Sequence, residues 1–167
     1  MSFNTQVVRV PRIGFGWDSH EFKPGIPLKI GGVRLPHDSG LAGHSDGDVL
    51  LHALTDALLG AVAAGDIGSY FPPSDPQWKG ADSAVFLREA QQQVAARGYT
   101  VGNVDCTLVL AAPKIGPHAT AIRENVASLL GIKTDHVGVK AKTPEGVGTE
   151  NAAVAHVVVL LTEIMWP

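Results

Sequence analysis

The sequence predicts an α/β fold, a two-layer sandwich in which helices cover one face of a single β-sheet. Segments rich in β-branched residues alternate loosely with helical segments, and a short hairpin is inserted near the beginning. The chain has 167 residues, of which 45% are hydrophobic and 17% are charged. These values indicate one domain over residues 1–167, with residues 1–11 as an N-terminal extension.

Two β-segments open the chain. A run of β-branched residues predicts a strand over residues 6–17. After it, PLKIGGVRLP predicts a hairpin whose two-residue loop, Gly31-Gly32, tolerates positive φ angles. In the first strand Phe15 and Trp17 point to the same face, where we expect both aromatic rings to be buried.

A helix with its own start signal follows over residues 48–64. Ser45 can cap its N-terminus while Asp48, three residues later, supplies the reciprocal carboxylate, and Gly65 ends the helix. At 100° per residue, leucine and alanine side chains cluster on one face. The opposite face carries the polar residues Asp48, His52, Thr55 and Asp56. On an isolated amphipathic helix such a face is typical of a solvated stripe.

The rest of the chain completes the alternation of helices and strands. Residues 65–81 form a loop rich in glycine and proline, which is long enough to indicate a function. The elements after it are a helix from Asp82 to Gly98, a strand at 100–113, a helix from Pro117 to near Gly131, and strands at 136–143 and 151–164.

Composition excludes several function classes. The formal net charge of -3 and the lack of a Lys/Arg run argue against nucleic acid and anionic membranes as partners. No apolar stretch approaches the ~20 residues of a membrane span. The first residues lack the apolar core of a signal peptide, so the cytoplasm is the expected location. The single cysteine, Cys106, fits a reducing compartment and a place in the core.

A metal-ligand pattern lies at the end of the first strand. Asp18 and His20 are two residues apart, so both side chains point the same way, and Gly14 and Gly16 leave room on that face. His52 from the helix would complete a set of two histidines and a carboxylate. Three protein ligands with one open position are typical of catalytic zinc. A hydrogen-bonded pair at a strand end is the alternative, and spacing alone does not separate the two.

Three polar loops offer anion or metal contacts. GHSDGD places His44 and Ser45 at a helix N-terminus, where free backbone N–H groups attract anions. APKIGP contains Lys114, which suits phosphate, and KAKTPEGVG contains Thr143 and Glu145, which suit magnesium and phosphate. Each loop also has a purely structural explanation, as a helix cap, a solvated lysine or a polar turn.

Taken together, these segments resemble the 2-C-methyl-D-erythritol 2,4-cyclodiphosphate synthases of the non-mevalonate isoprenoid pathway. The resemblance covers roughly residues 12–148 and is carried by RIGFGWDSHEF, IGGVRLP, GHSDGDVLLHALTDALLGA, GYTVGNVDCTLVLAAPKIGPH and VKAKTPEGVG. It implies a homotrimer whose subunits each have a four-stranded mixed sheet with helices on one face. It also implies a phosphorus–oxygen lyase that forms the 2,4-cyclodiphosphate and CMP from 4-diphosphocytidyl-2-C-methyl-D-erythritol 2-phosphate.

The resemblance assigns roles to residues of this chain. The catalytic set would be Asp18, His20, His52, Thr143 and Glu145. The first three would bind one zinc ion per subunit, and Glu145 would bind magnesium or manganese. The methylerythritol phosphate would be held by His44, Ser45, Asp66, Ile67, Gly68, Phe71 and Asp75. The cytidine nucleotide would be held by a neighbouring subunit through Ala112, Pro113, Lys114, Ile115, Lys142 and Thr143.

The chain departs from the family pattern at three points. Phe15 stands where histidine is usual, Pro144 stands where threonine is common, and residues 146–153 are shorter and lack an arginine. In relatives that segment lines a central cavity of the trimer, so we do not carry over its isoprenoid ligand. Two alternatives stay open: a zinc-dependent nucleoside-diphosphate phosphohydrolase, and a non-catalytic family member that binds a nucleotide or an isoprenoid.

Overall fold

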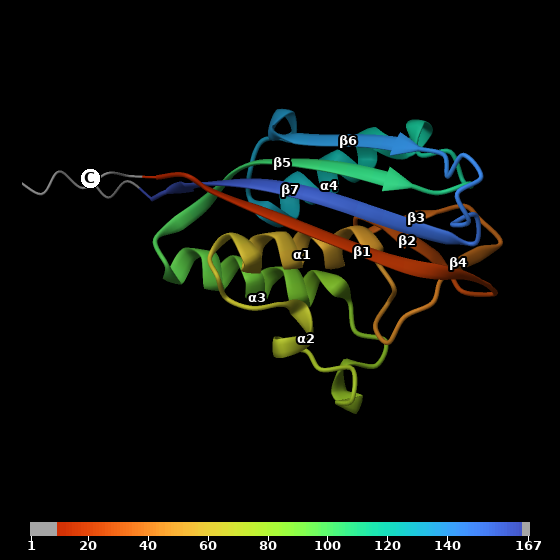
Figure 1. The fold of residues 1–167 in the computed structure, drawn as a ribbon, viewed down its shortest axis with the longest axis horizontal. Helices are drawn as coiled ribbons and strands as arrows, with labels where there is room; N and C mark the ends of the chain where they lie inside the picture. The colour runs from red at the N-terminus through yellow and green to blue at the C-terminus, as the bar shows by residue number, and fades with distance from the viewer. Residues whose placement is uncertain (1–9, 165–167) are drawn as a thin grey trace, which may run out of the picture.

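The computed structural model describes residues 10–164, which form a five-stranded mixed sheet with helices packed against one face (Figure 1). The strand order is β4-β1-β7-β5-β6, in which only the β5–β6 pair is parallel. The five strands are β1 (Arg12–Pro24), β4 (Ser39–Leu41), β5 (Tyr99–Val109), β6 (Val137–Lys142) and β7 (Ala152–Glu163). A separate hairpin is made of β2 (Leu28–Ile30) and β3 (Val33–Leu35).

The sheet has one strand more than the four we expected, and its first strand lies further along the chain. The predicted strand over residues 6–17 is wrong at its end, because β1 continues to Pro24; residues 6–9 lie outside the described residues. The reason is long-range pairing. β7 pairs with β1 as far as Glu21, and β4 then takes over at Phe22.

The three longer helices follow the predicted order, whereas the short α2 lies in the segment predicted as a loop. The helices are α1 (Val49–Ala61), α2 (Ile67–Tyr70), α3 (Ser83–Ala96) and α4 (Ala119–Leu130), with 3-10 turns at Pro76–Trp78, Gly116–His118 and Thr134–His136. The carboxylate of Asp82 caps α3, and Gly131 ends α4 in the left-handed conformation, as their residue types predict. The Gly31-Gly32 hairpin is also confirmed, with φ angles of 61° and 76°.

Asp48, and not Ser45, is the N-cap of α1. Its carboxylate accepts a hydrogen bond from the Leu51 amide at 3.1 Å. It also accepts from the amides of Gly31 at 2.9 Å and Gly32 at 2.6 Å. The prediction of Ser45 is wrong because local spacing does not reveal the amides of the hairpin, which lie 16 and 17 residues before Asp48 and donate to its carboxylate. One carboxylate therefore ties the start of α1 to the β2–β3 turn.

The backbone of α1 lies directly against β1. A Cβ atom built on Gly14 would lie 1.8 Å from the Ala57 carbonyl oxygen, and one built on Gly16 would lie 2.1 Å from that of Ala53. Glycine is therefore required at both positions, because any side chain would collide with helix backbone. This contact holds α1 at the face of β1 that also carries Asp18 and His20.

Within residues 10–164, no helix covers the opposite face of β1. Phe15 and Trp17, which we expected to be buried, are 58% and 56% exposed, and Ile13 is 71% exposed. The alternation in the sequence correctly predicts that these side chains share one face of the strand. The expectation that this face is buried is wrong, because the helices cover the other face. The buried face of β1 instead carries the two glycines, since the core on that side is filled by α1.

Candidate metal centre and substrate pocket

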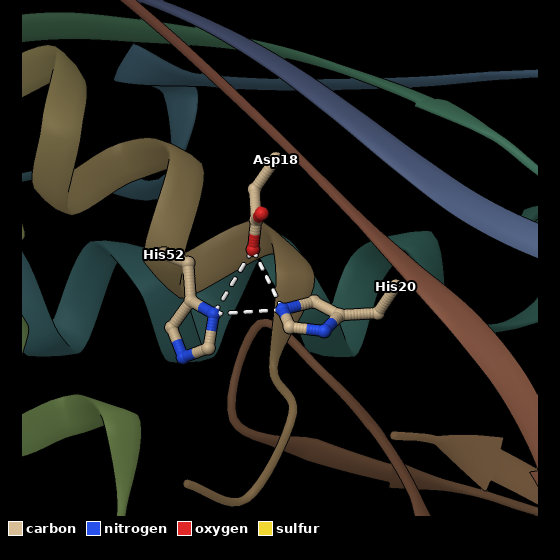
Figure 2. Close-up of side chains that lie close together, drawn as sticks. All are labelled: Asp18, His20 and His52. Atoms are coloured by element: carbon tan, nitrogen blue, oxygen red, sulfur yellow. Dashed lines mark hydrogen bonds and ion pairs between the residues drawn. The ribbon is translucent and has the colours of Figure 1, made fainter. Parts of the chain in front are cut away.

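Asp18, His20 and His52 converge on one point, as Figure 2 shows. Asp18 Oδ2 lies 2.8 Å from His20 Nε2 and 3.0 Å from His52 Nδ1, and the two nitrogens are 3.0 Å apart. Asp18 and His20 come from β1, and His52 comes from the first turn of α1. The side chains on one face of the strand therefore meet the helix residue, and the three form a group that could hold a metal ion.

The environment of the cluster favours an ionised carboxylate. Burial raises the pKa of Asp18, but hydrogen bonds and charge from the two histidines outweigh it and leave the pKa well below its usual value. Burial lowers the pKa of His20, but its bond to Asp18 outweighs that effect, so its pKa is raised. His20 Nδ1 donates to the Ala42 carbonyl oxygen at 2.6 Å, which directs Nε2 toward the cluster.

These donors fit a divalent zinc ion. Neighbouring ligands of a tetrahedral zinc ion lie ~3.3 Å apart if each zinc–ligand distance is about 2.0–2.1 Å. The observed separations of 2.8–3.0 Å need only a small expansion to reach that value. Two imidazoles and one carboxylate are borderline donors that suit this ion. Among the described residues this is the group that could hold a metal, and Glu145 is not part of such a group.

A pocket of about 350 Å³ opens beside the cluster. Eight of the residues that we predicted line it: Asp18, His20, His44, Ser45, His52, Ile67, Gly68 and Phe71. The polar face of α1 that resembled a solvated stripe is thus directed inward, since Thr55 is fully buried and His52 is 8% exposed. The pocket wall beside it comes from the long loop, as its length indicated.

Sequence reasoning missed three residues of the pocket wall, namely Asp56, Trp78 and Phe86, and included Pro73 only as part of the loop 71–75. Asp56 had a signal, because it shares the polar face of α1 with His52. The Phe71 ring lies 4.4 Å from that of Phe86 and 4.9 Å from that of Trp78, so aromatic rings form one side of the pocket. The helical spacing of Phe86 with other apolar residues predicts only that it is a core residue of α3.

Asp66 and Asp75 do not line this pocket. The Asp66 carboxylate caps α2 by accepting from Ser69, which lowers its pKa. The Asp75 carboxylate accepts from the Gln77 amide at 3.0 Å, and its backbone oxygen lies 3.3 Å from His44 Nε2. Both aspartates therefore shape the loop that borders the pocket.

The predicted nucleotide residues line a different pocket, of about 430 Å³. It contains Pro113, Lys114, Ile115, Lys142, Thr143 and Glu145, whereas Ala112 lies next to it in the chain. The Thr143 hydroxyl donates to the Glu145 carboxylate. The two pockets share no lining residue. The structure of one subunit therefore does not bring the predicted nucleotide residues together with the predicted zinc ligands.

The fold contains no helix, among the described residues, with the length and apolar character needed to cross a membrane. The cluster of Asp18, His20 and His52 faces a pocket that has aromatic rings on one side.

The chain is similar to proteins of described activity. Residues 11–162 match the YgbB family. The chain is 69% identical over 150 residues to a 2-C-methyl-D-erythritol 2,4-cyclodiphosphate synthase from Koribacter versatilis (strain Ellin345), covering 90% of this chain and 97% of that relative. A solved structure of 2C-methyl-D-erythritol-2,4-cyclodiphosphate synthase has a TM-score of 0.85 at 47% identity, and a bound form with CDP has 0.85 at 45%. Each comparison covers 90% of this chain and 99% of the other.

Proposed function

Because the chain belongs to the YgbB family, we propose that it converts 4-diphosphocytidyl-2-C-methyl-D-erythritol 2-phosphate to 2-C-methyl-D-erythritol 2,4-cyclodiphosphate and CMP. The chain is an enzyme of the non-mevalonate isoprenoid pathway, as the identity with its relatives indicates. The reaction is an attack of the 2-phosphate on the β-phosphorus, with CMP as the leaving group. The observation that carries the assignment to this chain's own residues is the Asp18–His20–His52 cluster beside a substrate-sized pocket.

The reaction does not require a strong general base. A phosphate monoester has a second pKa of about 6, so the attacking group is already anionic at neutral pH. The difficulty is to bring two anionic groups together in an orientation that allows attack. In the proposed mechanism, His44 and Ser45 hold the methylerythritol phosphate, and the rings of Phe71 and Trp78 limit access of water. Excluding water also disfavours hydrolysis, the reaction of the phosphohydrolase alternative.

The metal ligands provide the remaining charge. When held by Asp18, His20 and His52, a zinc ion supplies positive charge that offsets the repulsion between the phosphates and stabilises the transition state. Lys114 and Lys142 add fixed positive charge in the second pocket, where we expect the cytidine diphosphate part of the substrate. Glu145 is the proposed ligand of a magnesium or manganese ion there, and Thr143 is a proposed contact of the nucleotide.

We further propose that the active site is completed by a neighbouring subunit in a homotrimer. The separation of the two pockets supports this, because one substrate must reach residues of both. The exposed apolar face of the sheet also supports it: Ile13, Phe15 and Trp17 lie next to Val158, which is 44% exposed. A large exposed apolar patch is typical of a surface that another chain covers.

The test is incubation of the purified enzyme with 4-diphosphocytidyl-2-C-methyl-D-erythritol 2-phosphate, zinc and magnesium, followed by phosphorus NMR. We expect the signals of a cyclic diphosphate and of CMP to appear together. Release of a ring-free phosphate would instead support the phosphohydrolase. Binding of the nucleotide with no product would support a non-catalytic family member.

A further inference from the structure

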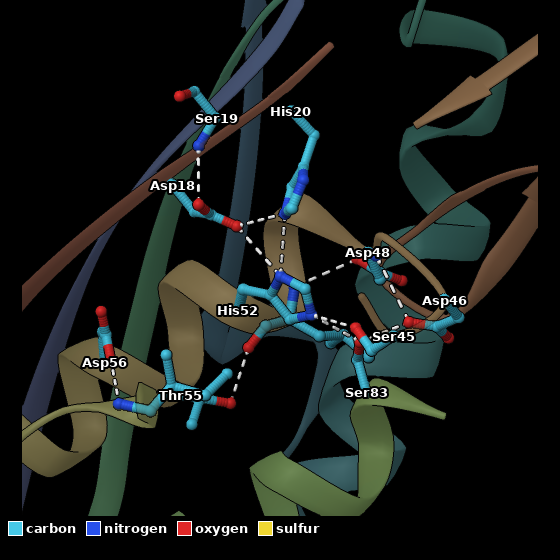
Figure 3. Close-up of polar contacts among 12 residues, drawn as sticks. Asp18, Ser19, His20, Ser45, Asp46, Asp48, His52, Thr55, Asp56 and Ser83 are labelled. Carbon is cyan, nitrogen blue, oxygen red and sulfur yellow. Dashed lines mark hydrogen bonds and ion pairs between the residues drawn. The ribbon is translucent and has the colours of Figure 1, made fainter. Parts of the chain in front are cut away.

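A chain of polar groups runs from His52 away from the pocket, and Figure 3 shows three of its members, His52, Ser83 and Asp46. His52 Nε2, the ring nitrogen not directed at Asp18, lies 2.8 Å from the Ser83 hydroxyl oxygen. That hydroxyl also contacts Asp46 Oδ1, and Asp46 Oδ2 accepts a hydrogen bond from Lys29 Nζ at 2.8 Å. The chain thus joins α1, the start of α3, the loop before α1 and the β2–β3 hairpin.

The charges in this chain fix the direction of its hydrogen bonds. Burial raises the pKa of Asp46, but its bonds to Lys29 and Ser83 outweigh burial and leave the pKa lowered. An ionised carboxylate only accepts hydrogen bonds, so the Ser83 hydroxyl proton points to Asp46. The Ser83 oxygen must then accept a hydrogen bond from the Nε2–H group of His52. His52 therefore carries its proton on Nε2, and Nδ1 is the nitrogen that can bind a metal.

Ser45 is the competing partner of His52. Its hydroxyl oxygen lies 3.0 Å from the same Nε2, but Ser45 is only half-buried and borders the pocket. Ser83 is fully buried, and its own proton is committed to a carboxylate. Lys29 also contacts the Asp82 carboxylate at 3.1 Å, and Asp82 caps the helix on which Ser83 lies. Ser83 is therefore held in place from two sides.

We propose that Ser83, held by Asp46 and Lys29, is a positioning residue that sets the tautomer and ring orientation of His52 for metal binding. The inference rests on the proposed metal role of Asp18, His20 and His52. Outer partners that fix a histidine ligand in this way usually change metal affinity about 10–100-fold when they are removed. Asp46, Ser83 and Lys29 were not among the residues that sequence reasoning assigned to the site.

The test compares Ser83→Ala with Ser45→Ala, a matched control that removes the other hydroxyl beside Nε2. Zinc affinity is measured by competition with a chromogenic chelator. Ser83→Ala should bind zinc about 10–100-fold more weakly, whereas Ser45→Ala should keep the wild-type affinity. In protein labelled with ¹⁵N-histidine and saturated with zinc, the His52 Nε2–H signal should persist in Ser45→Ala. It should broaden in Ser83→Ala, because that proton then exchanges with solvent.

A second variant, Asp46→Asn, tests the proposal even if Ser83→Ala does not fold. In Asp46→Asn the amide nitrogen can donate to Ser83, which frees the hydroxyl proton to turn to His52 and favours the wrong tautomer. This variant should lose zinc affinity at least as strongly as Ser83→Ala. Thermal melting of each metal-free variant shows whether it is folded, and Asp46→Asn decides the question if Ser83→Ala does not fold.

The outcomes separate the two proposals. A wild-type protein that fails to bind zinc would refute the metal centre and the role of Ser83 with it. A wild-type protein that binds zinc, together with a folded Ser83→Ala of unchanged affinity and unchanged Nε2–H signal, would overturn the role of Ser83 alone. Loss of affinity in Ser45→Ala with none in Ser83→Ala would transfer the role to Ser45.

Discussion

Substitution of Gly16 by alanine tests whether the contact between β1 and the backbone of α1 sets the spacing of the three candidate metal ligands. The added Cβ would lie 2.1 Å from the Ala53 carbonyl oxygen and 2.6 Å from the Ala57 amide nitrogen. Ordinary contact begins at 3.4 Å, so α1 has to retreat from β1 by about 1.3 Å. Neither neighbour can move aside as a flexible side chain could, since both are helix backbone. His52 lies beside Ala53 and would move with it.

The expected cost follows from overpacking. Inserting a methyl group into a well-packed contact usually costs about 1–3 kcal/mol, and more where the backbone must shift. For a domain of this size each kcal/mol lowers the melting temperature by roughly 2–4 °C, so we expect a fall of about 2–12 °C in the metal-free protein. Zinc affinity, measured by chelator competition, should fall as well, because a retreat of about 1.3 Å would widen the His52–Asp18 separation of 3.0 Å beyond the ~3.3 Å between ligands of a tetrahedral zinc ion.

Gly60→Ala is the matched control. Gly60 lies in the same helix, and the nearest atom to its added Cβ, the Phe15 carbonyl oxygen, is 3.9 Å away. Alanine in a helix is favoured over glycine by about 0.5–1 kcal/mol, so this variant should be slightly more stable and bind zinc normally. A Gly16→Ala protein that matches the wild type in both melting temperature and zinc affinity would refute the reasoning.

Four further outcomes are expected. Asp48→Ala leaves three amides without their acceptor, so unfolding in urea should show a loss of roughly 3 kcal/mol or more; a loss under about 1 kcal/mol would contradict the capping role. Trp17→Glu places a charge on the exposed apolar sheet face and should give a monomer by light scattering; an intact trimer would show that this face is not an interface. Removing zinc with a chelator should lower the melting temperature, because a ligand at 1,000 times its Kd stabilises by about 4 kcal/mol; an unchanged temperature would contradict the metal centre. Burial raises the pKa of the Cys106 thiol to about 12, so it should resist alkylation at pH 8 in the folded protein, whereas rapid labelling would place it at the surface.

The sequence predicts the order of the elements because each has a local signal. Alternation of apolar residues, cap residues such as Asp82 and the glycine pair of the hairpin all depend on near neighbours. The end of β1 has no such signal, since the residues around His20 are polar and pair with β7, near Ala153, and only Phe22–Pro24 pair with β4. The exposed position of Phe15 was missed for a related reason, because alternation identifies two faces without stating which one the helices cover.

The residues of the site also fall into those with a local sequence signal and those without one. The Asp18–His20 spacing follows from strand geometry, and His52 lies on a helix with a recognisable polar face, so the cluster could be predicted. Ser83 and Phe86 could not, because each reaches the site only through the placement of α3 against α1. Nothing within a few residues of Ser83 indicates that its hydroxyl faces a histidine 31 positions earlier.

The geometry of the metal cluster is set by parts of the chain that do not bind the metal. Gly16 fixes the distance between α1 and β1, and Asp48 fixes the start of α1 against the hairpin, one turn before His52. Replacing His52 by alanine should therefore remove the metal and leave the fold intact, because the contacts that position the helix remain. Gly16→Ala should weaken both the fold and metal binding. A His52→Ala protein that lost its fold along with its metal would show instead that the ligands themselves hold α1 in place.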